Sequence, residues 1–183
     1  MAKLKPPVSE QDHMKGDPHA PVILVEYGDF QCPHCGAAHP ILKEIEKKFS
    51  DNIAFIFRHF PLSESHPMAL PAAISAEAAA NQGRFWQMHD LIFENQYRLS
   101  PQTLLALAEA LKLDMKTFQK DMRNPTLSEK VEANFESGIL SGVNGTPSFY
   151  INGTKFNGSY DFQSLSHAIE AGISQTEEKH VSK

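Results

Sequence analysis

The chain has 183 residues, of which 41% are hydrophobic, and carries 17 basic against 22 acidic side chains. This length can bury one sizeable core, and a net charge of -5 gives no basic surface for nucleic acid or an anionic membrane. No apolar stretch approaches the length of a transmembrane helix, so neither nucleic-acid binding nor membrane insertion is expected.

Residues 1–19 are polar and contain prolines, which predicts a loosely held N-terminal arm. The start of the chain leads into polar sequence and not into the hydrophobic region of a signal peptide, so a cytoplasmic location is expected. The alternative is a periplasmic or other extracytoplasmic mature domain whose leader has been removed.

The next elements have the order of a βαβ unit. A β-branched, apolar run at residues 22–27 predicts a strand, and residues 33–49 place apolar side chains at helical spacing. Residues 52–60 predict a second strand, which the chain reaches through this helix. Such a crossover places the N-terminus of the helix at the carboxyl edge of the sheet.

Both cysteines lie in one stretch, Cys32-Pro33-His34-Cys35, where the first strand gives way to the helix. A sulfur at a helix N-terminus meets unsatisfied backbone N–H groups and the positive end of the helix dipole, which favour thiolate over thiol. We therefore expect Cys32 to be an accessible nucleophile of low pKa and Cys35, one turn later, to be the buried resolving thiol. His34 adds a candidate positive charge beside both, and Pro33 suits an early helical position.

Three other interpretations of the cysteine pair are weaker. A zinc site would use Cys32, Cys35 and His39, but no second cysteine pair completes a set of four ligands. A static disulfide would close too short a loop to restrict the unfolded chain much. Two unrelated thiols would leave the strand-to-helix position unexplained. The prediction is a redox-active dithiol that needs neither a metal nor a cofactor.

From residue 65 to residue 140 the pattern changes to a helical period with no convincing strand. Five helices are predicted here, beginning near residues 69, 85, 101, 115 and 125. Ser100 and Asp114 are predicted to cap two of them. Strand signals return at residues 148–151 and continue as a hairpin, after which Asp161 is predicted to cap a final helix.

The cysteine stretch resembles the active site of the DsbA-like thiol-disulfide oxidoreductases of the thioredoxin superfamily. Residues 143–151, Val-Asn-Gly-Thr-Pro-Ser-Phe-Tyr-Ile, are similar to the cis-proline loop and following strand of this family. The resemblance implies an α/β, thioredoxin-like fold (βαβ…ββα) with an inserted all-helical subdomain. The expected boundaries are an arm at 1–19, a discontinuous thioredoxin-like domain at 20–63 and 142–174, a helical insertion at 64–141 and a flexible tail at 175–183.

The resemblance also implies roles for three further residues. Glu26, six residues before Cys32, sits where the family carries a buried acid, and would accept the proton of Cys35. A cis Thr146–Pro147 bond is expected to place Pro147 against the cysteine pair. Thr146 would then offer backbone hydrogen bonds to an extended substrate.

The implied function is thiol-disulfide oxidoreductase, in which the cysteine pair exchanges with substrates through a mixed disulfide. The expected partners are cysteine-containing proteins or peptides, with glutathione as a further candidate, and a redox recycling partner. Two alternatives stay open. One is a glutathione-dependent transferase or isomerase of the same architecture, against which Cys35 argues, and the other is a peptide-binding or chaperone-like module.

Overall fold

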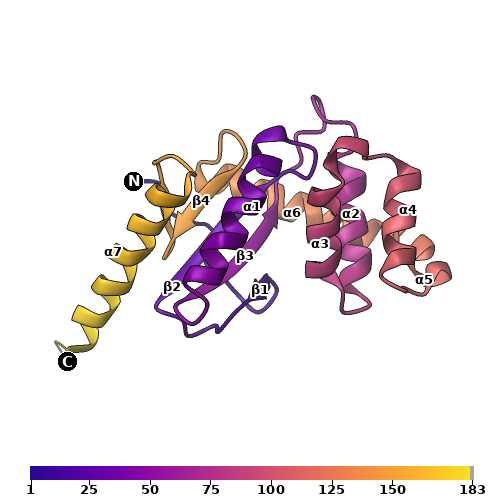
Figure 1. Ribbon diagram of the computed structural model, residues 1–183. Coiled ribbons are helices and arrows are strands. Elements are labelled where there is room, and N and C mark those ends of the chain that lie inside the picture. The colour runs from indigo at the N-terminus through magenta and orange to yellow at the C-terminus, as the bar shows by residue number, and fades with distance from the viewer. Residues whose placement is uncertain (182–183) are drawn as a thin grey trace. The chain divides into compact units, whose positions relative to one another are not determined.

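The structure is a computed structural model that describes residues 1–181, apart from the side chain of His180. The chain divides into two compact units. Unit 1 comprises Met1–Tyr27, Ala37–Arg58 and Ser137–Lys183, and unit 2 comprises Gly28–Gly36 and His59–Glu136. Figure 1 shows the strands of the first and the helices of the second.

Unit 1 is built on a five-stranded sheet with the strand order β1-β3-β2-β4-β5. The strands are β1 (His13–Lys15), β2 (Val22–Gly28), β3 (Ile53–His59), β4 (Ser148–Ile151) and β5 (Thr154–Phe156). β1 pairs antiparallel with β3, and β4 pairs antiparallel with both β2 and β5. β2 and β3 are buried along nearly their whole length because they consist mainly of β-branched and aromatic residues. The predicted α/β class is confirmed.

Two helices pack on this sheet. Lys48, at the end of α1 (Pro33–Lys48), forms an ion pair with Glu170 of α7 (Phe162–Val181), with 2.9 Å between Nζ and Oε1. α7 approaches β2 so closely that a Cβ built at Gly172 would lie 2.9 Å from Val22 Cγ2. Gly172 therefore lets the helix and the sheet come into contact.

The N-terminal segment is held more firmly than the sequence indicated. Arg58 donates two hydrogen bonds to the Asp12 carboxylate, at 2.8 and 2.9 Å, and a third to Tyr27 Oη at 3.0 Å. The Leu4 N–H donates to the Gly153 carbonyl at 2.9 Å. The expectation of a loose arm is wrong, because β1 pairs with β3 and a buried ion pair holds the segment before it.

The five α-helices of unit 2 begin at or close to the residues predicted from the sequence. They are α2 (Ala69–Ala80), α3 (Phe85–Glu94), the 3-10 helix η1 (Gln96–Arg98), α4 (Pro101–Ala110), α5 (Met115–Asp121) and the first part of α6 (Pro125–Ser141). Ser100 Oγ accepts the Thr103 N–H at 3.0 Å, and Asp114 Oδ1 accepts the Thr117 N–H at 2.7 Å. Both predicted caps are confirmed. Among residues 1–181, no helix has the length and apolar composition needed to cross a bilayer.

The final helix continues to Val181, so the prediction of a flexible tail from residue 175 is wrong for the part of the tail that the structure describes. Thr176 Oγ1 donates to the Pro21 carbonyl at 3.0 Å, which fixes the helix beyond residue 175 to the start of β2. Residues 182 and 183 lie outside the described part of the chain.

Acid should weaken the start of α7 through Asp161. The carboxylate accepts the backbone N–H of Ser164 and then its hydroxyl, and these bonds lower the pKa of Asp161 to about 2 from its ordinary value of 3.8. Since the folded-state pKa is the lower one, the stabilisation is complete above about pH 4 and is lost as the pH falls through about 2. Urea unfolding, followed by circular dichroism at a series of pH values, measures this effect. Between about pH 4 and pH 2, Asp161→Asn should lose less stability than wild type. Identical pH profiles would contradict the role of this cap.

Candidate redox site

The two cysteines lie in unit 2, on a tight turn that leads from β2 into α1. β2 ends at Gly28 and the helix begins at Pro33. Within the turn, the Cys32 N–H donates to the Asp29 carbonyl at 3.1 Å. The Cys32 carbonyl in turn accepts the Gly36 N–H at 3.0 Å, which is the first hydrogen bond of the helix. Cys32 therefore immediately precedes the helix, and Cys35 lies in its first turn.

The electrostatics of this position favour a thiolate at Cys32. The first backbone N–H groups of a helix have no carbonyl partner within it, and they carry the positive end of its dipole. The first turn of α1 contains no acidic side chain that would compete for these groups. His34 is exposed, so when it is protonated its charge lies beside the turn. The arrangement supports a nucleophilic sulfur.

Both cysteines are buried, with Cys32 4% and Cys35 1% exposed, and neither forms a disulfide in this structure. The prediction of a buried Cys35 is confirmed, and that of an accessible Cys32 is wrong. Gln96 of η1 is bound to the backbone of the cysteine turn, because its Nε2 donates to the Phe30 carbonyl at 2.9 Å and to the Cys32 carbonyl at 2.8 Å. A Cβ at Gly36 would overlap the Gln96 carboxamide, which shows how closely this side chain covers the turn.

Asp29 is a second residue of the site that sequence reasoning missed. Its buried carboxylate accepts the Gln31 N–H at 2.8 Å and the Leu62 N–H at 3.0 Å, and lies 2.7 Å from His66 Nδ1. Its own N–H donates to Cys35 Sγ at 3.5 Å. Asp29 therefore fixes the cysteine turn to the loop that follows β3. The available signal was an acid directly after the end of a strand.

The other predicted site residues lie in unit 1. Glu26 is 1% exposed on β2, so the expected burial of this acid is confirmed, and it pairs in register with Phe149 of β4. The Thr146–Pro147 peptide bond is cis and directly precedes β4. Glu26 and Pro147 thus belong to neighbouring strands of one sheet. The contact of Pro147 with the cysteine pair stays a prediction.

A family model described as Thioredoxin matches residues 8–171. The chain belongs to the thioredoxin family. Its fold is that of the DsbA-type members: it matches oxidised BdbD from Bacillus subtilis with a TM-score of 0.84 and 24% identity, over 94% of this chain and 98% of that one. The thiol-disulfide exchange protein alpha-DsbA2 from Wolbachia pipientis matches with a TM-score of 0.78 and 22% identity, over 89% of this chain and 88% of that one. At these identities the two structures establish the fold alone.

Sequence similarity extends to part of a longer protein. The chain is 42% identical over 167 residues to a protein named Na(+)/H(+) antiporter NhaA 1 from Salinispora arenicola. The alignment covers 91% of this chain and 26% of that protein. The chain therefore spans about a quarter of the length of the curated relatives it matches.

Proposed function

We propose that the protein is a thiol-disulfide oxidoreductase in which Cys32 and Cys35 alternate between dithiol and disulfide. The observation that carries this proposal is the position of the pair, with Cys32 immediately before α1 and Cys35 in its first turn. The helix N-terminus favours a thiolate at the first sulfur, and the spacing lets the second sulfur reach it. Membership of the thioredoxin family and the DsbA-type fold support it.

In the oxidising direction, a substrate thiolate attacks Cys32 Sγ, and the Cys32–Cys35 bond breaks. Cys35 leaves as a thiolate and takes up a proton. A second substrate thiolate then attacks the substrate sulfur of the mixed disulfide, which releases Cys32 as a thiolate and the substrate as a disulfide. Two electrons pass from substrate to protein, and a redox partner must remove them before the next cycle. The reverse sequence reduces a substrate disulfide.

Two other side chains and one loop have proposed roles in this cycle. Glu26, buried on β2, would accept the proton of Cys35 when that sulfur attacks the mixed disulfide. The charge of protonated His34 would favour the thiolate and so make the disulfide form more oxidising. Thr146 and Pro147 would present backbone to an extended substrate at the start of β4. The candidate substrates are cysteine-containing proteins or peptides, and glutathione is the small-thiol candidate.

Equilibration with glutathione redox buffers tests the proposal. The cysteine pair should titrate as one two-electron couple, and the wild-type protein should catalyse the reduction of insulin by dithiothreitol. Cys32→Ser should do neither, while its circular dichroism spectrum stays that of the wild type. A wild-type protein that exchanges no faster than Cys32→Ser would refute the proposal and leave the peptide-binding module in its place.

A further inference from the structure

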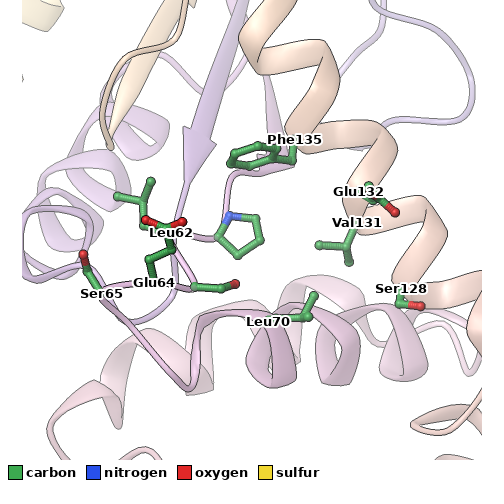
Figure 2. Close-up of a pocket in the computed structure, with 10 residues that line it drawn as sticks. Leu62, Glu64, Ser65, Leu70, Ser128, Val131, Glu132 and Phe135 are labelled. Atoms are coloured by element: carbon green, nitrogen blue, oxygen red, sulfur yellow. The ribbon is translucent and has the colours of Figure 1, made fainter.

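A cavity of about 620 Å³ lies within unit 2, beside the loop that follows β3 (Figure 2). The loop residues 61–65 line one side of it, Leu70 of α2 lines another, and α6 lines the third. Its volume falls within the range of about 300–1,000 Å³ that is typical of ligand sites. The cavity is therefore large enough for more than one side chain of a bound peptide.

The wall of the cavity is mainly apolar. Its apolar residues are Pro61, Leu62, Leu70, Val131 and Phe135. Figure 2 shows Phe135 and Val131 projecting into the space from α6, and Leu70 projecting from α2. The ring of Phe135 stacks on that of Phe60 with 4.3 Å between centroids, so this part of the wall is already packed without a ligand. Such a wall binds an apolar side chain by removing it from water.

Two carboxylates are part of the lining of this cavity. Glu64 comes from the loop and Glu132 from α6, and they lie on different sides of the cavity in Figure 2. Both side chains belong to exposed residues, and neither forms an ion pair with any other residue of the described chain. Lys130, the lysine closest to Glu132 in sequence, forms an ion pair with Glu77, with 2.7 Å between Nζ and Oε2. The cavity therefore combines an apolar interior with two uncompensated negative charges, which favours a cationic neighbour.

The cavity wall is fixed to the turn that carries Cys32. The N–H of Leu62, which lines the cavity, donates to the Asp29 carboxylate at 3.0 Å, and His66 Nδ1 lies 2.7 Å from the same carboxylate. The N–H of Met68, two residues before Leu70, donates to the Gln31 side chain at 2.6 Å. A ligand held in the cavity is thus held at a fixed position relative to the redox turn.

We propose that this cavity is a substrate subsite that binds an apolar side chain of a peptide segment in which lysine or arginine stands beside that side chain. The proposal rests on the proposed disulfide exchange and specifies its substrate class. The apolar side chain would enter between Leu70, Val131 and Phe135, and the flanking cation would meet Glu64 or Glu132. A segment with acidic residues in the same places would be repelled.

Binding of cysteine-free peptides tests this separately from the redox chemistry. Fluorescence anisotropy would compare three labelled peptides of equal length on the full chain: leucine flanked by lysines, leucine flanked by glutamates, and serine flanked by lysines. At low salt the first should bind about fivefold more tightly than the glutamate peptide, since an exposed ion pair contributes up to about 1 kcal/mol. It should bind at least about fivefold more tightly than the serine peptide, which has no apolar side chain to remove from water. High salt should reduce the difference in affinity between the two leucine peptides, because it screens the charges.

Matched variants locate the binding. The double variant Glu64→Gln/Glu132→Gln should bind the lysine and glutamate peptides with equal affinity. Ser128→Phe, which fills the cavity from α6, should weaken the binding of the leucine–lysine peptide at least about fivefold. Glu109→Gln/Glu129→Gln removes the same charge from exposed positions outside the cavity and should bind like wild type. All of these variants should reduce a small aromatic disulfide at the wild-type rate.

Two results would overturn the proposal: equal affinity of the wild-type protein for the lysine and glutamate peptides, or a preference for lysine that survives in Glu64→Gln/Glu132→Gln. If no protein, wild type included, reduces the small disulfide, the proposed function itself is overturned.

Discussion

Replacing Cys35 with serine should trap the protein in a covalent complex with its substrate and lower turnover at least about a hundredfold. Cys32 keeps its place at the helix N-terminus in this variant and still attacks a substrate disulfide. The mixed disulfide then has no internal thiol to resolve it. Non-reducing electrophoresis after incubation with a disulfide-bonded protein should show a new band of the summed mass, which disappears on addition of dithiothreitol.

The complementary change, Cys32→Ser, separates the two roles. This variant should form no mixed disulfide, because the remaining Cys35 lies inside the first helical turn and not immediately before the helix, where the free N–H groups favour a thiolate. Trapping by Cys32→Ser instead of Cys35→Ser would reverse the assignment of nucleophile and resolving thiol. Trapping by both at equal rates would show that the order of the cysteines along the helix does not decide which one attacks.

The position of the cysteine pair at a strand-to-helix junction could be predicted from the sequence because both cysteines lie in one stretch, but the burial of Cys32 could not. Helix starts could be predicted for a similar reason. A cap is a local hydrogen bond between a side chain and an N–H three residues later, and Ser100, Asp114 and Asp161 all form one. The hydrophobic periods of β2, β3 and the insertion helices are likewise local properties of the chain.

The parts that the sequence did not reveal depend on residues far apart in the chain. β1 is only three residues long, and it forms because β3 offers a free edge and Arg58, 46 residues beyond Asp12, pairs with that acid. Gln96 donates to the Cys32 carbonyl across 64 residues of sequence, so the backbone of the cysteine turn is held by a distant part of the chain. No local pattern distinguishes these side chains from ordinary surface glutamines and acids.

Removing the Asp29 carboxylate should destabilise unit 2 by about 3 kcal/mol. Asp29 is 1% exposed and serves as acceptor for the N–H groups of Gln31 and Leu62 and as partner of His66. Asp29→Ala leaves these donors without an acceptor, at a cost of about 1–3 kcal/mol for each that stays buried. The loss is a large share of the roughly 5–15 kcal/mol that stabilises a typical domain. Trp86, the single tryptophan, belongs to unit 2 and reports its unfolding by fluorescence.

The midpoint of urea unfolding, followed by Trp86 fluorescence, should be lower by about 1 M or more in Asp29→Ala. The reason is that the free energy of unfolding typically falls by about 1–3 kcal/mol per molar urea. His66→Ala removes one partner whose side chain is 20% exposed, and should cost about 1 kcal/mol. Asp121→Ala, which loses one exposed contact with Asn81, should cost less than about 0.5 kcal/mol.

The Asp29 N–H that faces Cys35 Sγ belongs to the turn that carries the cysteines, so Asp29→Ala should also raise the rate at which iodoacetamide alkylates the cysteines of the folded protein. If Asp29→Ala loses no more stability than His66→Ala and its cysteines are alkylated at the wild-type rate, the carboxylate does not hold the redox turn in place.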